Sequence, residues 1–462
     1  MFLITPDHKT CRKSHRAVVH RQRAVAAFAA LLLAATGRHA RAVHKLSASH
    51  ARGTNQSKRR IPHGRHAANV NPRPRQATSH ARQRSLYPKR WPGASFFNRT
   101  KLAGNWFGVR KRLQRHGIDF EGSITSDFSK SFFGGLRTNF YAARYLLDIS
   151  TTVHTKQLFG LPGGRFYADF QNREGPNAQN VQVGDIQGFS NIDAFSAATL
   201  ARMWYQQNFL HKRIRVRVGE MYVDDQFLYP DYGQDFLNPS MAHDPTVFVL
   251  PTYPQGEPGI DAFLYPKKSF YLAAGIFDGH LHEVLNYDPG GIFFIAETGV
   301  RWKIGPHKLA GKLKLGFWDH TGTFQTLNGA PNVAFASGWY SVLSQTFWKS
   351  SSKNNPRSLG GFLQIGGAQP NVSIIDRHIG AGLAWTGFMP GRPNDELGLG
   401  VTYARLSPEA GLPYNFENDY EAFYRIQVTP SFIVQPDLQY IQHPGGNLPN
   451  ALVGTIRLIV NF

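Results

Sequence analysis

The chain has 462 residues, with 52 Lys and Arg, 30 Asp and Glu, and a net charge of +22 at neutral pH. So basic a protein would suit nucleic acid or an anionic membrane surface if the charge were spread along the chain. Residues 1–90, however, contain 20 of the basic residues and one acid, Asp7, whereas the remainder contains 32 basic and 29 acidic residues. This distribution argues against a nucleic-acid-binding body and places the excess charge in the amino-terminal region.

Residues 1–42 have the pattern of a cleaved signal peptide. A basic region ends at Arg23, an apolar run covers residues 24–35, and the small-x-small sequence at 40–42 offers a cleavage site. The apolar run is too short to span a bilayer as a helix. The one cysteine, Cys11, lies in the part that would be removed, so we expect no disulfide and no cysteine metal site in the mature chain.

Residues 43–90 are rich in Arg, His, Ser, Ala and Asn, and they have no apolar periodicity. A segment without apolar surface to bury cannot offset its ordering entropy, so we expect a basic, disordered linker. A solvated linker is the simplest interpretation of this segment. Its charge would also suit lipopolysaccharide, peptidoglycan or nucleic acid.

From Trp91 onward, apolar and polar residues alternate with a period of two. In residues 213–218, for example, three aliphatic side chains alternate with three arginines. No apolar run approaches 18 residues, which excludes transmembrane helices, whereas strands of about 9–11 residues with unlike faces suit a barrel wall. Sixteen segments have this pattern: residues 118–128, 139–154, 165–172, 199–209, 212–221, 258–266, 269–277, 292–304, 308–319, 338–349, 357–366, 376–386, 396–406, 419–429, 431–442 and 450–462.

Residues 451–462 form the clearest of these predicted strands. Every second residue back from Phe462 is apolar or Gly, and the other face carries Asn461, Arg457 and Thr455. In outer-membrane barrels the closing strand places an aromatic residue in the girdle at the membrane interface. The terminal phenylalanine is therefore expected to lie in such a girdle.

The connections between predicted strands alternate in length. Short ones such as 209–213 alternate with long ones, above all 173–198 and 222–257. Short periplasmic turns and long outer loops are typical of outer-membrane barrels, and a charged lumen requires a wide barrel. We therefore predict an all-β fold, a transmembrane antiparallel up-and-down β-barrel of about 16 strands, formed by residues 118–462 after a periplasmic segment at 91–117.

Several stretches of this body resemble the OprB family of carbohydrate-selective porins. They are Leu102–Arg110 with His116–Ile118, Leu158–Gly164, Gly184–Ile192, Gly275–Gly279, Pro390–Asp395, Gln435–Tyr440 and Pro444–Gly446. The resemblance covers residues 100–462, and the basic segment 43–90 is not part of it. It implies a sixteen-stranded, multi-pass channel in the outer membrane of a Gram-negative bacterium, through which carbohydrates diffuse passively.

The resemblance also implies partners. Sugars would be the transported solutes, and outer-membrane lipid and lipopolysaccharide would surround the wall. The outer-membrane assembly machinery would recognise the terminal Phe462. A homo-oligomer is one assembly open to such a barrel, and we expect no nucleic-acid partner and no cofactor.

The chemistry of sugars indicates which residues would contact them. A sugar presents hydroxyl groups and a face of C–H groups, so arginine donors, carboxylate acceptors and aromatic rings suit it. The predicted inward faces supply Asp148, Arg202, Trp204, Arg215, Arg217, Glu297, Arg301, Trp318, His320 and Asp437. The long loops add Asp185, Asn191, Asp193, Asp224, Asp225 and Glu257. For each inward arginine, an ion pair within the wall is the alternative to solute contact.

The arginines of residues 213–217 allow a test of this assignment. If Arg215 and Arg217 face the lumen, we expect Ala at either position to change transport while the barrel still folds. Val216 would face lipid, where an Arg near the bilayer midplane costs about 2–4 kcal/mol.

The sequence contains no recognisable catalytic constellation. It has no G-x-S-x-G elbow, no P-loop and no H-E-x-x-H motif, since His282-Glu283 lacks the second histidine. The pair Asp224-Asp225 would suit glycoside hydrolysis or a calcium site, but acidic pairs in loops are more often merely solvated. We predict that the protein is not an enzyme and holds no metal. Two alternatives remain open: an envelope anchor or adhesin, and an outer-membrane enzyme acting on lipid or glycan.

Overall fold

The computed structural model describes residues 99–176, 181–280, 287–352 and 357–462. The predicted signal peptide (1–42) and linker (43–90) lie outside the described residues, as does the first part of the predicted periplasmic segment.

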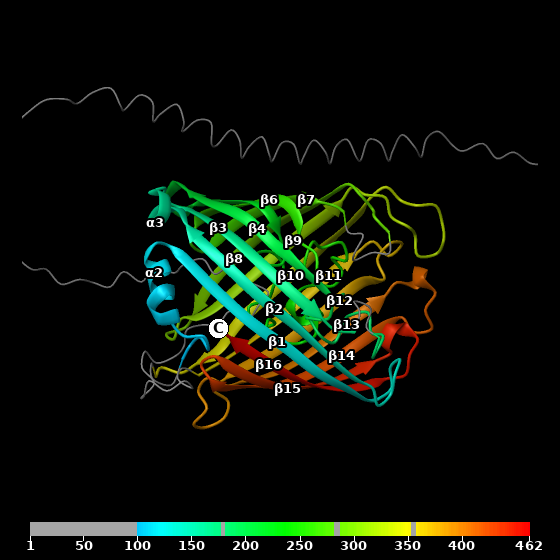
Figure 1. Ribbon diagram of the computed structural model, residues 1–462. Coiled ribbons are helices and arrows are strands. Elements are labelled where there is room, and N and C mark those ends of the chain that lie inside the picture. The colour runs from blue at the N-terminus through cyan, green and yellow to red at the C-terminus, as the bar shows by residue number, and fades with distance from the viewer. Residues whose placement is uncertain (1–98, 177–180, 281–286, 353–356) are drawn as a thin grey trace, which may run out of the picture. The chain divides into compact units, whose positions relative to one another are not determined.

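The described residues form a closed barrel of sixteen antiparallel strands, each paired with its neighbours in sequence, and β1 pairs with β16 (Figure 1). The strands are β1 (Ile118–Phe133), β2 (Tyr141–His154), β3 (Gly164–Glu174), β4 (Ala197–Phe209), β5 (Ile214–Met221), β6 (Glu257–Lys267), β7 (Phe270–Asp278), β8 (Ile292–Ile304), β9 (Leu309–His320), β10 (Ala336–Lys349), β11 (Ser358–Ala368), β12 (Ile375–Thr386), β13 (Glu396–Leu406), β14 (Phe416–Thr429), β15 (Phe432–Gln442) and β16 (Ala451–Asn461). The predicted fold class and strand number are confirmed.

The helices are short and lie between strands or in front of β1. They are η2 (Trp106–Gly108), α2 (Val109–Arg115), α3 (Thr155–Phe159), η3 (Leu210–Lys212), α4 (Pro239–Ala242), η4 (Pro408–Ala410) and η5 (Pro444–Gly446). In the part of the chain that the structure describes, none of these helices has the length and apolar character to cross a membrane.

Alternation along each strand sorts side chains between the two faces of the wall, because successive side chains of a strand point to opposite sides. On β5, Arg215 and Arg217 point inward and are buried, whereas Val218 points outward and is 51% exposed. Outward positions elsewhere carry large apolar residues such as Leu315 and Ile379, both about half exposed. Large apolar side chains therefore predominate on the outer face of the wall, whereas most of its buried charged side chains point inward.

The two ends of the barrel differ in their connections. At the end where β1 begins and β16 finishes, the connections are short, as at residues 210–213, 268–269 and 430–431. At the opposite end they include residues 175–196 and 222–256. We name the first the terminal end and the second the loop end.

Polar contacts across the β1–β16 seam close the barrel. Arg457 of β16 donates to both carboxylate oxygens of Asp127 on β1, each at 2.7 Å. The hydroxyls of Ser129 and Thr455 lie 2.9 Å apart one step further along the same pair of strands. Register is fixed by such inward pairs, because a slip of one residue would turn them toward the outer surface.

The last residue adds to this seam. Phe462 and Gly122 exchange backbone hydrogen bonds of 2.9 and 3.2 Å. The phenyl ring lies over Gly122 so closely that a Cβ there would stand 2.6 Å from it. A glycine at this position of β1 therefore provides the space that the terminal ring occupies.

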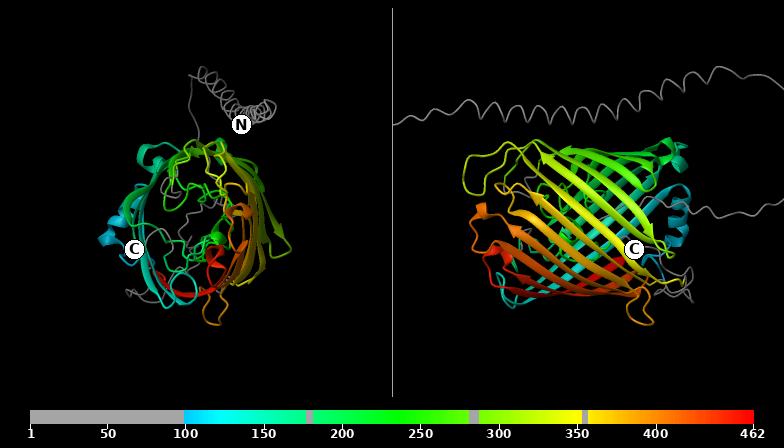
Figure 2. Two further views of the ribbon diagram at one scale, coloured as in Figure 1. Left: turned by 90° about the vertical axis from the view of Figure 1, so that its right-hand side faces the viewer. Right: turned by 180° about the vertical axis from the view of Figure 1, so that it is seen from behind.

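The two long loops fold back into the barrel. The view along the barrel in Figure 2 shows chain segments crossing its interior. Residues of the loop 222–256, including Val223, Phe227 and Val249, are fully buried against inward residues of the wall. This loop therefore folds into the barrel and fills part of the lumen.

Candidate functional site within the barrel lumen

Two glutamates on β14 hold the long loops against the wall. Glu417 accepts hydrogen bonds from the backbone amides of residues 186–187, both at 2.9 Å. Glu421, four residues further along β14, accepts the amides of residues 237–238 at 2.5 and 3.0 Å. A buried carboxylate is costly unless hydrogen-bonded, and a loop amide without a partner is costly as well. The same hydrogen bonds therefore satisfy the buried carboxyl group of each glutamate and the backbone amides of the loop.

A third glutamate makes a similar attachment on the other side of the lumen. Glu297 of β8 accepts the amide of Leu228 at 2.8 Å, and the hydroxyls of Tyr271 and Tyr340 donate to it at 2.6 and 2.9 Å. Its side chain is fully buried. The loop 222–256 is thus hydrogen-bonded to opposite walls of the barrel.

Two inward arginines, Arg202 of β4 and Arg217 of β5, are buried in ion pairs. Arg202 donates to Asp169 at 2.8 Å and to both oxygens of Asp225 at 3.1 Å, so it links the wall to the loop. Arg217 donates to Asp261 on the neighbouring strand at 2.8 and 2.5 Å. For Arg202 and Arg217, the structure therefore shows the alternative to solute contact, an ion pair, whereas the Arg215 guanidinium lies over the Phe263 ring at 4.0 Å.

The inward aromatic residues pack against the long loops as well. Trp318 stacks on Phe293 and meets Phe248 of the loop edge to face, with centroids 5.9 Å apart. Trp204 stacks on Tyr167 at 4.9 Å. One half of the lumen is therefore filled by an aromatic core.

The ten inward residues predicted from the sequence all lie on the wall, but they differ in access to solvent. Nine are buried: Asp148, Arg202, Trp204, Arg215, Arg217, Glu297, Trp318, His320 and Asp437. Arg301, at the terminal end of β8, is exposed. Their assignment as sugar contacts stays a prediction, and burial makes a supporting role the more direct expectation for the nine.

A cavity of about 180 Å³ lies between the loops and the β15–β16–β1 wall. Hydroxyl, amide and carboxylate groups line it together with apolar side chains such as Ile192 and Ile459. The lining residues are Ser123, Thr125, Ser190, Asn191, Ile192, Asp193, Asp224, Gln234, Asp235, Pro239, Ala242, His243, Thr252, Tyr253, Gln435, Arg457, Ile459 and Asn461.

The charged groups of the cavity are held in place by neighbours. Asp193 lies 3.4 Å from the Arg144 guanidinium, and Asp235 lies 3.5 Å from that of Arg425. The Thr252 hydroxyl donates to Asp224 at 2.6 Å. Each loop carboxylate therefore keeps a fixed position and still borders open space.

Three of the six loop candidates line this cavity, namely Asn191, Asp193 and Asp224. Asp185, Asp225 and Glu257 are instead buried. His243 and Arg457, which also line the cavity, are not among the residues predicted from the sequence. The alternation along β16 could have identified Arg457, because it lies on the same face of the strand as Thr455 and Asn461. His243 lies in a loop, where no sequence pattern indicates the direction of a side chain.

Among the residues that the structure describes, no group of three or more His, Cys, Asp and Glu side chains is arranged to hold a metal ion. The acidic side chains of the loops contact arginines, hydroxyls and backbone amides instead.

Comparisons with known proteins identify the family. The family profile described as "Carbohydrate-selective porin, OprB family" matches residues 141–462. The chain belongs to the OprB family. Porin B of Pseudomonas aeruginosa is 21% identical over 421 residues, which cover 78% of this chain and 91% of that protein. The putative porin QuiX of Acinetobacter baylyi is 19% identical over 412 residues, covering 79% of this chain and 94% of the relative.

A solved structure supports the fold of this OprB-family porin independently. The high-pH structure of Pseudomonas putida OprB superimposes with a TM-score of 0.73 at 19% identity, over 80% of this chain and 100% of that one. Family and fold together place the protein in the bacterial outer membrane as a sugar-selective β-barrel channel. The terminal end then faces the periplasm and the loop end faces outward.

The periplasmic mouth of the porin is strongly basic. Five successive turns at residues 155–163, 210–213, 268–269, 305–308 and 350–357 contain no Asp or Glu. Basic residues in and beside these turns are exposed, and they include Lys156, Lys212, Arg213, Lys267, Lys268, Arg301, Lys303, Lys308 and Lys349. Clustered charge of one sign at a pore mouth raises the local concentration of anions.

Burial changes the acidity of two groups in the cavity. Burial raises the pKa of Asp193 to about 6, although the Arg144 guanidinium opposes this shift. Burial likewise lowers the pKa of His243 to about 4. His243 is therefore neutral between pH 5 and 8, whereas Asp193 changes from mainly protonated to mainly ionised within that range.

We expect the cation preference of the channel to increase between pH 5 and pH 7. The reason is that Asp193 gains its negative charge over this interval while His243 stays neutral. Reversal potentials in a potassium chloride gradient would measure the change, and the Asp193→Asn variant should lose most of it. A variant that keeps the full pH step would show that another group is responsible.

Proposed function

We propose that carbohydrates cross this porin by passive diffusion through the cavity between the long loops and the β15–β16–β1 wall. The observation that carries the proposal is the lining of that cavity, where hydroxyls, amides and carboxylates lie beside the tyrosine ring of Tyr253. Neutral polyols need donors and acceptors for their hydroxyls and an apolar surface for their C–H face. Weak and repeated contacts of this kind let a solute leave as well as enter.

Particular residues have distinct parts in this proposal. The carboxylates of Asp193 and Asp224 accept from sugar hydroxyls, and the Arg457 guanidinium and Asn191 amide donate to them. The Tyr253 ring offers a surface for C–H groups, while its hydroxyl donates to the carbonyl of Ile192 at 2.9 Å. A small solute would therefore meet both acceptors and donors in the same narrow space.

The buried inward residues have a structural part. Arg202, Arg217 and Glu297 hold loops and strands in position, and they determine the width of the passage without touching the solute. Exposed Arg301 lies at the periplasmic mouth, where it would contact a departing solute.

Selective blocking of the cavity tests this path. In a chain in which Cys11 is replaced by Ser, Asp224→Cys would be modified with a bulky thiol reagent and assayed by liposome swelling with a panel of sugars. We expect modification to abolish most sugar entry, because the label fills a cavity of about 180 Å³. Lys308→Cys, on an exposed periplasmic turn, is the matched control and should keep its swelling rate after labelling.

The outcomes separate the candidate functions. Swelling that survives modification of the Asp224→Cys variant would move the path elsewhere in the barrel. Unmodified protein that passes no sugar at all would favour an envelope anchor or adhesin. A charged solute of similar size, included in the panel, distinguishes sugar selectivity from simple sieving.

We further propose that Phe462 is the residue through which the outer-membrane assembly machinery recognises the chain. Deletion of Phe462 should reduce the amount of barrel in cells, whereas refolded protein should lose little stability, since one end of β16 is affected. Quantitative blotting of outer membranes, compared with urea midpoints of refolded protein, measures both effects. Equal cellular levels would contradict the proposal.

We also propose that outer-membrane lipid and lipopolysaccharide surround the wall, and that the barrel can associate with further copies of itself.

A further inference from the structure

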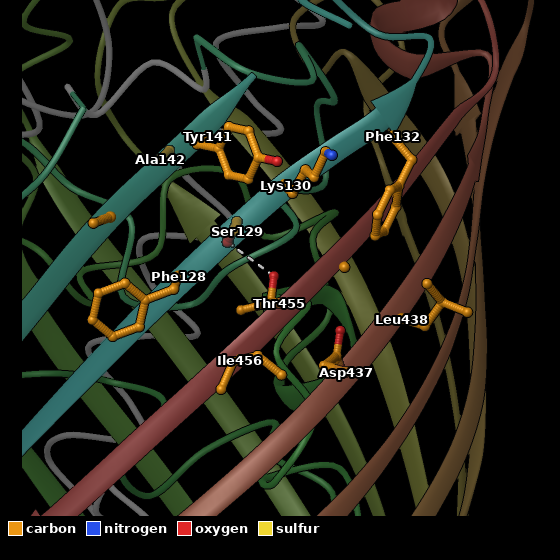
Figure 3. A pocket seen from close by; sticks show the side chains of 12 residues that line it. Phe128, Ser129, Lys130, Phe132, Tyr141, Ala142, Asp437, Leu438, Thr455 and Ile456 are labelled. Carbon is orange, nitrogen blue, oxygen red and sulfur yellow. Dashed lines mark hydrogen bonds between the residues drawn. The ribbon is translucent and has the colours of Figure 1, made fainter. Parts of the chain in front are cut away.

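A groove of about 620 Å³ lies on the wall where β2, β1, β16 and β15 meet (Figure 3). It is mostly apolar, and its outward-facing lining comprises Phe128, Lys130, Phe132, Tyr141, Leu438, Gly454 and Ile456. Because the outward face of the wall contacts membrane lipid, the groove is a hollow in the lipid-facing surface rather than part of the lumen.

The hollow arises from one small residue in a row of paired residues. Lys130 pairs with Gly454, which in turn pairs with Leu438 on the next strand. Gly454 leaves space beneath the Phe132 ring, since a Cβ there would stand 2.8 Å from that ring. The groove is therefore lined by aromatic rings on one side and has backbone as its floor.

The ammonium group of Lys130 lies within this groove. Figure 3 shows it between Tyr141 and Phe132, whose ring centroids are 4.8 and 5.4 Å from the nitrogen. No ion pair or hydrogen bond joins the Lys130 side chain to any residue that the structure describes. An ammonium on the lipid side of a barrel is costly unless an anion or water meets it.

The position of Lys130 indicates where that anion would come from. Lys130 is three residues from Phe133, the last residue of β1, so it lies about 10 Å or less from the outer end of the strand. Aromatic residues at the ends of barrel strands mark the level of the membrane interface. The ammonium therefore lies near the head groups of the outer leaflet, while Phe128 and Ile456 lie deeper.

We propose that this groove binds a phosphorylated lipid of the outer leaflet, the class to which lipopolysaccharide belongs. A lipid phosphate would accept a hydrogen bond from Lys130, and an acyl chain would lie over Gly454 toward Phe128 and Ile456. The inference rests on the outer-membrane location of the porin and adds a specific lipid site to it. A second copy of the chain fits less well, because a two-fold contact at this face would bring Lys130 close to its own counterpart.

Binding of lipopolysaccharide to detergent-solubilised porin tests the proposal, with lipopolysaccharide stripped of its lipid phosphates as the second probe. Wild-type protein should bind the phosphorylated probe more tightly than the stripped one. Lys130→Gln should weaken the binding of the phosphorylated probe by about fivefold, as expected for the loss of about 1 kcal/mol from one cation near a lipid surface. The same substitution should leave the affinity for the stripped probe unchanged.

Two further variants complete the design. Gly454→Leu fills the groove and should weaken both probes, because the acyl chain loses its space, whereas Lys308→Gln at the periplasmic end should change neither. Equal binding of both probes by wild type, or no effect of Lys130→Gln, would overturn the proposal. A mass measurement showing lipid-free dimers that Gly454→Leu dissociates would assign the groove to a second copy. Sugar swelling by the Lys130→Gln variant should stay at the wild-type rate, so failure of the lipid site is separable from failure of the channel.

Discussion

Arg217→Ala is expected to destabilise the folded barrel by about 3–5 kcal/mol, which is the typical cost of removing one partner of a buried ion pair. Arg217 and Asp261 are almost completely buried, at 1% and 0% side-chain exposure, and are joined by two hydrogen bonds. Without the guanidinium, the buried Asp261 carboxylate loses the cation that is hydrogen-bonded to it. Urea unfolding of refolded protein in lipid vesicles, followed by tryptophan fluorescence, would measure the loss.

A double-mutant cycle separates the ion pair from other effects. Asp261→Ala alone should cost a similar amount, and the double variant should be less destabilised than the sum of the two single changes. Arg301→Ala, a change of the same chemical size at the exposed periplasmic mouth, should stay within about 0.5 kcal/mol of wild type. Arg217→Ala with an unchanged unfolding midpoint would show that water or another group compensates Asp261.

This expectation differs from the one that the sequence supports. The alternation of residues 213–218 correctly predicts that Arg217 faces inward, and from this we expected a channel residue replaceable without loss of folding. The partner, Asp261, lies on β6 beyond a long loop, opposite Arg217 in the register of the two strands. An alternating pattern indicates to which face of the sheet each residue points, but it does not indicate which residue of the neighbouring strand lies opposite. The ion pair could therefore not be predicted.

The strands of the wall can be predicted from the sequence, because the alternation of apolar and polar residues is a local pattern within each strand. All sixteen predicted segments overlap an observed strand, although boundaries shift, as at β1, which extends to Phe133 rather than residue 128. The open cavity is less readable. Asn191 and Asp224 lie there because glutamates of β14 and other wall residues hold two loops in place. Such contacts join residues about 180 to 230 positions apart, and no local pattern encodes them.

Replacement of Glu421 by Ala should increase the single-channel conductance and reduce discrimination among sugars. Glu421 accepts the amides of Leu237 and Asn238, which lie in the middle of the loop 222–256. A hydrogen bond contributes about 0.5–1.5 kcal/mol net, so the loop would lose about 1–3 kcal/mol of attachment when both bonds to Glu421 are removed. The sixteen-strand wall does not depend on these two bonds, and the barrel should still insert into membranes.

Planar-bilayer recordings of Glu421→Ala would measure the conductance, and liposome swelling with sugars of increasing size would measure discrimination. Glu421→Gln should lie between Ala and wild type, because its amide keeps one carbonyl oxygen as an acceptor. Glu409→Ala is the control at the outer rim, where Glu409 accepts only from the Asn328 side chain at 2.5 Å and holds no lumen loop. The attachment of the loop to β8 through Glu297 is untouched by the change. A Glu421→Ala channel with wild-type conductance would therefore mean that this attachment and the packing of Phe236 against Phe423 suffice to keep the passage narrow.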